Sequence, residues 1–289
     1  MTFNSKIFLS LTKSRLAISV VFSALAGYIL AADNFNFLNI FLLLVGGYCI
    51  VGASNSFNQI IEKDKDSMMD RTKNRPLPKN HISKSKAFWI SVFLTLVGLL
   101  CLYLINYKTA FFAALSVFLY TCVYTPLKSI TPLSVFIGAI PGAIPFMLGW
   151  VAATNKFGIE PGVLFMIQFL WQFPHFWAIG WVLDEDYKKA GFKLLPSGET
   201  DSATAFQIVF YSLWVVVVSL VPAFHYTGKL RLSFTAALAI ALLGSVMLYF
   251  AMTLMKKKSK KAAQNLIGVS IVYITALQLI YVIDKYMTI

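Results

Sequence analysis

The stretch Phe88–Ile105, FWISVFLTLVGLLCLYLI, decides the fold, because it continues for nearly a full membrane span without a charged side chain. A helix needs about 20 mostly apolar residues to cross the hydrocarbon core of a bilayer. Similar runs follow one another along the chain and are joined mostly by short connections. The sequence therefore predicts an all-α polytopic membrane protein, a bundle of about nine transmembrane helices in one domain spanning residues 1–289. The expected spans are residues 16–32, 37–60, 86–106, 109–125, 132–153, 161–183, 203–225, 231–255 and 265–284.

The composition agrees with a membrane protein. Hydrophobic residues make up 58% of the chain and charged residues only 13%, whereas soluble domains average about 25% charged residues. The net charge of +13 has two interpretations, a basic surface for nucleic acid or positive loops at a cytoplasmic membrane face. The apolar background favours the second, so we expect the lipid bilayer and no nucleic acid as a partner.

The distribution of Lys and Arg predicts the orientation. With a cytoplasmic N-terminus and nine alternating helices, most of these residues fall on the cytoplasmic side, as the positive-inside rule requires. The two long connections, residues 62–84 and 184–202, lie on this side as well. Most of the acidic residues also lie there, which the rule does not require. Two acidic clusters at one membrane face indicate a site.

The first acidic cluster reads NQIIEKDKDSMMDRTKNRPLP, from Asn58 to Pro78. Asn58, Glu62 and Asp66 are spaced four residues apart, which places them on one face if the helix continues to Asp66. Oxygen ligands in this arrangement suit magnesium, which is commonly bound by one or two carboxylates together with substrate phosphates. These three residues are therefore predicted metal ligands and catalytic residues.

A basic run follows directly, and it contains Arg71, Lys73 and Arg75. Arginine forks match phosphate oxygens, and lysine adds a point charge. Lys128 and Lys193 are weaker candidates for the same task. The combination favours binding of a diphosphate and stabilisation of its departure; the alternative is a solvated helix end with ordinary charge mixing.

The second acidic cluster reads DEDYKKAGFKLLP, from Asp184 to Pro196. Asp186 is the expected ligand for a second magnesium or for the other side of the diphosphate, and Asp184 and Glu185 stay open as alternatives. Tyr187 either hydrogen-bonds a phosphate oxygen or lies in the aromatic belt of the membrane interface.

Several motifs resemble one known family. The first cluster resembles the NxxxDxxxD motif of the UbiA superfamily of membrane prenyltransferases, with Glu62 where the family usually has Asp. A glutamate can also bind magnesium, and its side chain is one methylene group longer than that of aspartate. The second superfamily motif is eroded in this chain. Between about Gly52 and Pro196, five motifs resemble the haem O synthase branch of the superfamily: RTKNRPLP, VYTPLKSIT, GAIPGAIPFMLGW, WQFPHFWA and DYKKAGFKLLP.

The resemblance implies an enzyme that transfers the farnesyl group of farnesyl diphosphate to a vinyl group of haem B and releases diphosphate. It implies Mg²⁺ as the cofactor and a bacterial cytoplasmic (inner) membrane as the location. It also implies a downstream haem A synthase or terminal oxidase assembly as a partner. Two alternatives stay open. One is a prenyltransferase acting on an aromatic quinone precursor, and the other is a transporter, which predicts charges near the bilayer midplane and paired broken helices.

His175 lies in WQFPHFWA, within an apolar aromatic run. A histidine at membrane depth is a functional candidate. It either ligates haem iron, positions a haem propionate, or packs between helices through a hydrogen bond. His175 is therefore the candidate for haem binding.

Overall fold

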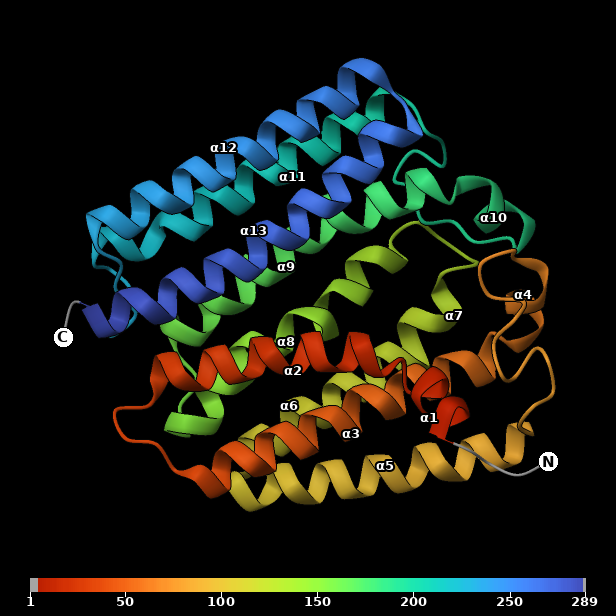
Figure 1. The fold of residues 1–289 in the computed structure, drawn as a ribbon, viewed down its shortest axis with the longest axis horizontal. Coiled ribbons are helices and arrows are strands. Elements are labelled where there is room, and N and C mark those ends of the chain that lie inside the picture. The colour runs from red at the N-terminus through yellow and green to blue at the C-terminus, as the bar shows by residue number, and fades with distance from the viewer. Residues whose placement is uncertain (1–4, 288–289) are drawn as a thin grey trace.

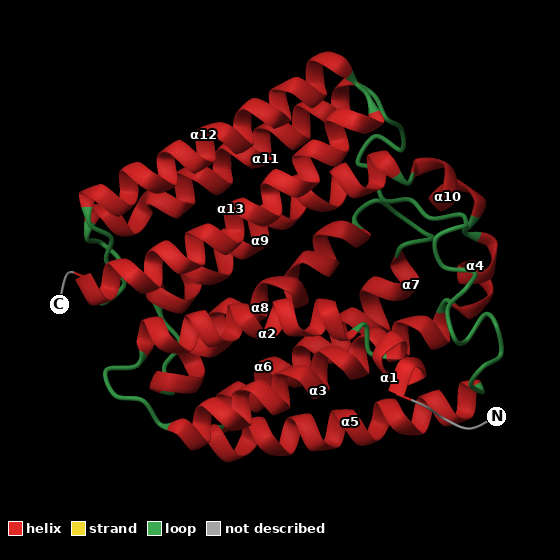
Figure 2. Ribbon diagram, in the orientation of Figure 1, coloured by secondary structure: helices red, strands yellow, loops and turns green. Residues whose placement is uncertain are grey.

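The computed structural model describes residues 5–287, and this part of the chain forms helices and loops without strands (Figure 2). Within it, nine helices are long and apolar enough to cross a membrane. The predicted all-α fold is confirmed. The spans are α2 (Ser14–Ala31), α3 (Phe37–Ile61), α5 (Lys84–Ile105), α6 with η1 and α7 (Tyr107–Leu127), α8 (Ser134–Thr154), α9 (Ile159–Val182), α11 with η2 (Ser202–Phe224), α12 (Phe234–Lys257) and α13 (Lys260–Met287).

The span boundaries differ from the predicted ones by a few residues, and two of these differences have local reasons. Helix α13 begins at Lys260, ahead of the predicted residue 265, because its first turn is polar and a hydropathy pattern does not detect it. Helix α12 begins after Ser233, whose hydroxyl accepts the N–H of Ala236. This N-cap satisfies one of the free donors of the first turn.

In the described part of the chain, three short helices lie outside the spans, and all are at the same end of the bundle, on the right in Figure 1. They are α1 (Ser5–Leu11), α4 (Lys63–Met68) and α10 (Asp184–Lys189). Helix α4 lies within the first acidic cluster and α10 within the second, so the fold gathers both clusters at one end.

Helices α2 and α8 pack so closely that glycine is required at their contact. A Cβ atom on Gly149 would lie 1.9 Å from the carbonyl oxygen of Ala24, and one on Gly27 would lie 2.0 Å from that of Phe146. The backbones therefore touch, as small residues allow between membrane helices. Gly149 belongs to the GAIPGAIPFMLGW motif.

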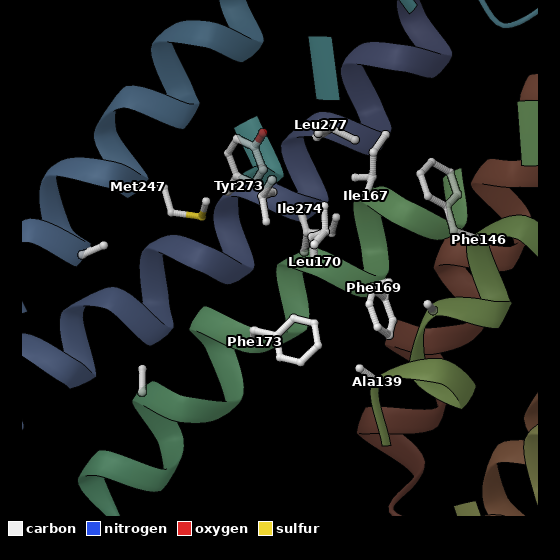
Figure 3. Close-up of a cluster of buried hydrophobic side chains, with 14 of the residues drawn as sticks. Ala139, Phe146, Ile167, Phe169, Leu170, Phe173, Met247, Tyr273, Ile274 and Leu277 are labelled. Atoms are coloured by element: carbon white, nitrogen blue, oxygen red, sulfur yellow. The ribbon is translucent and has the colours of Figure 1, made fainter. Parts of the chain in front are cut away.

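The largest buried cluster joins α8, α9, α12 and α13, with Phe146, Phe173 and Tyr273 among its fully buried side chains (Figure 3). In contrast, α5 exposes large apolar side chains such as Trp89, at 65%, and Phe93, at 65%. Such a surface is stable when lipid covers it. The chain is an integral membrane protein.

Candidate active site

Asn58, Glu62 and Asp66 occupy one helical face at the membrane border. The backbone hydrogen bonds continue across the junction of α3 and α4, since Glu62 N–H donates to Asn58 O at 2.9 Å and Asp66 N–H to Glu62 O at 2.7 Å. All three side chains are buried. The helix thus continues past Glu62 and places the three side chains as the four-residue spacing predicts.

Two basic residues neutralise the carboxylates on this face. Lys128 Nζ lies 2.5 Å from Glu62 Oε1, and Arg75 Nη1 lies 2.7 Å from Asp66 Oδ2. Three of these four side chains are no more than 10% exposed, and that of Arg75 is 17% exposed. Arg75 and Lys128 are thus the predicted phosphate ligands that the structure places directly against the predicted metal ligands.

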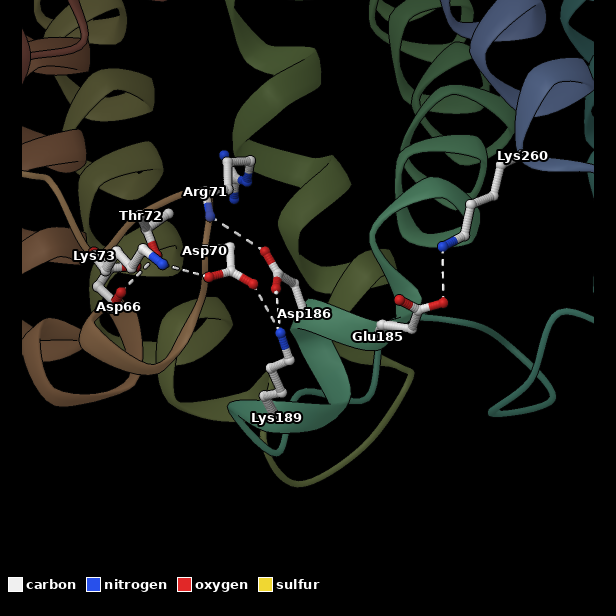
Figure 4. Close-up of polar contacts among 9 residues, drawn as sticks. All are labelled: Asp66, Asp70, Arg71, Thr72, Lys73, Glu185, Asp186, Lys189 and Lys260. Carbon is white, nitrogen blue, oxygen red and sulfur yellow. Dashed lines mark hydrogen bonds and ion pairs between the residues drawn. The ribbon is translucent and has the colours of Figure 1, made fainter.

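The second acidic cluster meets the first loop through Asp186 (Figure 4). Its Oδ2 accepts the backbone N–H of Arg71 at 3.2 Å, and Lys189 Nζ lies 3.3 Å from its Oδ1. The same ammonium group lies 2.8 Å from Asp70 Oδ2, so Lys189 joins the two loops. We call these contacts among Asp70, Arg71, Asp186 and Lys189 the loop bridge.

The loop bridge shifts the pKa values of its carboxyl groups. Hydrogen bonds from Lys189 and Lys73 hold the pKa of Asp70 at about 2. Desolvation pushes the pKa of Asp186 upward, but the backbone N–H groups of Arg71 and Asp70 and the ammonium group of Lys189 together outweigh it and lower the pKa. Both carboxyl groups are therefore ionised at neutral pH.

The structure separates the three acidic residues of α10. Asp184 pairs with Lys188 at 2.7 Å. Glu185 is 78% exposed and pairs with Lys260 at 2.8 Å, away from the first loop (Figure 4). Asp186 is the member of the three that contacts the first loop, as the sequence favoured.

The remaining predicted phosphate ligands lie farther from the buried face. The side chain of Arg71 is exposed, and Lys73 is exposed and pairs with Asp70 at 2.5 Å. Tyr187 and Lys193 line a cavity of about 340 Å³ beside α10. Lys193 also donates its backbone N–H to Lys128 O at 2.7 Å.

His175 lies on α9, buried against α13. Its Nδ1 is 2.8 Å from Ser270 Oγ, and its ring stacks on Trp171 with centroids 4.7 Å apart. The Ser270 hydroxyl also lies 2.8 Å from Ile267 O, which can only accept; when the single hydroxyl proton is donated there, Nδ1 of the imidazole is the donor toward Ser270. A neutral His175 therefore has its lone pair on Nε2, as a metal ligand requires.

Sequence reasoning missed two residues of the site. Lys13 lies between α1 and α2, where burial and then the charges of Arg75 and Lys128 lower its pKa to about 7. The only sequence signal was its place before the first span, which topology alone explains. Thr125 contacts Asn58 from another helix, with its Oγ1 3.2 Å from Asn58 Nδ2, and only the YTPLK motif pointed there.

The donor set fits a magnesium ion that shares its ligands with a substrate. Among residues 5–287, no three side chains of His, Cys, Asp or Glu come together as a ready-made metal site. However, Asp66 Oδ1 is buried without a hydrogen-bond partner in the described chain. A carboxylate oxygen in that state is a natural cation ligand, and magnesium completes its shell with phosphate oxygens and water.

A buried amide–carboxylate face with basic neighbours, at one end of a bundle of membrane helices, defines the class of a membrane prenyltransferase. The model of the UbiA prenyltransferase family matches residues 20–274, and the chain belongs to this family.

Curated relatives and solved structures agree with this assignment. The chain is 59% identical to protoheme IX farnesyltransferase of Flavobacterium psychrophilum, over 97% of this chain and 94% of the relative. It is also 59% identical to the protein of that name from Christiangramia forsetii, over 96% and 93%. A structure described as digeranylgeranylglyceryl phosphate synthase superposes with a TM-score of 0.80 at 20% identity, covering 97% of this chain and 98% of that one. A UbiA homologue from Archaeoglobus fulgidus bound to GPP and Mg²⁺ gives 0.68 at 14%, covering 96% and 99%. At these identities the structures show the fold alone.

Proposed function

We propose that this protein transfers the farnesyl group of farnesyl diphosphate to a vinyl group of haem B and forms haem O. The main support is the buried face of Asn58, Glu62 and Asp66 with its two basic neighbours, in a chain 59% identical to two proteins named protoheme IX farnesyltransferase. On this proposal, residues 1–289 act as one prenyltransferase domain.

The diphosphate would bind between the two acidic clusters. Asn58, Glu62 and Asp66 would hold magnesium, and Asp186 would contribute from the opposite loop. Magnesium would supply positive charge to the oxygens of the leaving group. Two UbiA homologue structures that contain Mg²⁺ with prenyl diphosphates support this choice of metal.

Lys128 and Arg75 can pair either with the carboxylates of the site or with the phosphate groups of the substrate. Without substrate, Lys128 and Arg75 neutralise Glu62 and Asp66. With substrate, the same ammonium and guanidinium groups would turn to phosphate oxygens, for which Arg offers a planar fork. Arg71 and Lys73 lie at the exposed rim and would meet the diphosphate as it enters.

The reaction begins when the bond between farnesyl C1 and the diphosphate oxygen breaks and the leaving group takes the electron pair. Arg75 and Lys128 stabilise the charge that develops on the diphosphate. The Lys128 ammonium group lies over the Tyr124 ring, 4.8 Å from its centroid. Once Lys128 turns to the diphosphate, this face of the ring would be open to stabilise the allylic cation. The haem vinyl group attacks C1, and water adds to the resulting cation and loses a proton.

Haem would lie deeper than the diphosphate, with His175 near its iron or a propionate. The lone pair on Nε2 supports the first role. We place the N-terminus in the cytoplasm and the site at the cytoplasmic face of a bacterial inner membrane, because the basic residues cluster at the end of the bundle that contains α4 and α10. From there haem O would pass to haem A synthase or oxidase assembly.

The test is mass spectrometry of haem extracted from cells with and without this protein. The proposal predicts haem that gains a hydroxyethylfarnesyl group only when the protein is present. Unchanged haem together with a newly prenylated aromatic acid would instead establish the quinone-precursor reaction.

A further inference from the structure

The span Tyr107–Leu127 contains a π-helix, η1 (Leu119–Tyr124), directly before Thr125. π-Helices are rare in proteins, and those that occur often lie at functional sites. The wider turn brings the backbone N–H of Thr125 to the carbonyl oxygen of Tyr120. It also directs the side chain of Thr125 toward Asn58 on α3, and Thr125 is 2% exposed.

The hydroxyl proton of Thr125 is used in a hydrogen bond within its own helical segment. Its Oγ1 donates to the carbonyl oxygen of Tyr120 at 2.8 Å, and a carbonyl oxygen can only accept. A threonine hydroxyl has one proton, so toward Asn58 it can only accept. Asn58 must therefore present its Nδ2 group to Thr125, at 3.2 Å.

The hydrogen bond from Asn58 Nδ2 to Thr125 also determines where Oδ1 of the same amide points. With Nδ2 directed at Thr125, Oδ1 of Asn58 points away from it, and among the described residues nothing donates to that oxygen. Rotation of the amide by a half turn would place Oδ1 against the lone pairs of Thr125. The direction of the amide therefore follows from the π-helix through one hydroxyl group.

We propose that Thr125 is a positioning residue that fixes the Asn58 amide with Oδ1 directed to the metal. The inference rests on the proposed role of Asn58 as a metal ligand. Partners of this kind orient metal ligands, and their loss typically lowers metal affinity about 10–100-fold. On this proposal Thr125 acts through Asn58, the residue that its hydroxyl contacts.

The experiment measures Mn²⁺ binding to the purified full-length protein by equilibrium dialysis, with the same inorganic diphosphate on both sides. Thr125→Val should weaken binding about tenfold or more, and Thr125→Ser, which keeps the hydroxyl, should restore it. Thr125→Ala is a second removal in case valine disturbs folding. Thr95→Val is the matched control, because Thr95 makes the same 2.8 Å bond to a backbone carbonyl within α5, and it should bind Mn²⁺ like the parent.

A double variant separates positioning from general damage. In an Asn58→Ala background, Thr125→Val should cause no further loss, since the residue through which it acts is gone. An additive loss overturns the inference, and so does parent-like binding by both Thr125→Val and Thr125→Ala. If Asn58→Ala alone binds Mn²⁺ like the parent, the proposed metal role of Asn58 fails, and the inference fails with it.

Discussion

The ion pair between Glu62 and Lys128 offers a quantitative test of the site. The two side chains are 6% and 10% exposed and 2.5 Å apart. Glu62→Gln keeps the shape of the side chain and removes its charge, so Lys128 stays buried without a counter-charge. Breaking a buried pair in this way costs about 3–5 kcal/mol.

Two aromatic rings reduce that cost. Lys128 Nζ lies 4.8 Å from the Tyr124 ring centroid and 5.3 Å from that of Phe192, and such contacts contribute about 0.5–2 kcal/mol each. Glu62→Gln should therefore lower the free energy of unfolding by about 2–3 kcal/mol. At about 2–4 °C per kcal/mol, the melting temperature should fall by about 4–12 °C.

The assay is thermal unfolding in detergent, followed by intrinsic tryptophan fluorescence. Lys128→Met should be similarly destabilising, because the buried Glu62 carboxylate then has lost its ion-pair partner. The double variant should regain most of the lost stability, since replacing a whole buried pair is often neutral or stabilising, yet it should stay inactive. If Glu62→Gln melts like the parent, the pair is not the buried ionic contact described, and the reasoning is wrong.

Three further predictions concern other parts of the site. Arg75→Lys keeps the charge but loses the fork, so the KM for farnesyl diphosphate should rise about tenfold; an unchanged KM in steady-state assays would contradict this. His175→Ala should alter the absorption spectrum of bound haem, and an unaltered spectrum with a full rate would make His175 a packing residue. Asp70→Asn should expose the first loop to trypsin. In the parent, protection should persist on acidification to pH 5. The pKa of Asp70 is lowered to about 2, so its ion pairs contribute their full stabilisation above its ordinary pKa of 3.8, and this stabilisation is lost as the pH falls toward 2.

The membrane spans could be predicted from the sequence because the bilayer imposes a simple requirement. A run such as Phe88–Ile105 has one stable arrangement in lipid, a spanning helix. The common face of Asn58, Glu62 and Asp66 was also predictable, since it depends only on helical periodicity and on the helix continuing past Ile61. Both inferences are local and need no knowledge of neighbouring helices.

The contacts across helices could not be predicted in the same way. The approach of Thr125 to Asn58 depends on a π-helix, which changes the register without a sequence period to mark it. The position of the half-buried Lys13 beside Arg75 and Lys128 depends on the break between α1 and α2. The sequence made Asp186 the expected ligand but left Asp184 and Glu185 open, because three consecutive acidic residues do not show which of them meets another loop. The contacts of Asp186 with Arg71 and of Glu185 with Lys260 decide between them.

The central claim is tested most directly by one reaction. Purified protein is incubated with Mg²⁺, farnesyl diphosphate, haem B and an aromatic quinone precursor together, and the products are identified by mass spectrometry, with Asp66→Asn as the inactive control. The account predicts that haem B alone acquires the hydroxyethylfarnesyl group and that the control forms no product. Farnesylation of the aromatic acceptor with unchanged haem, or full turnover by the Asp66→Asn variant, would contradict it.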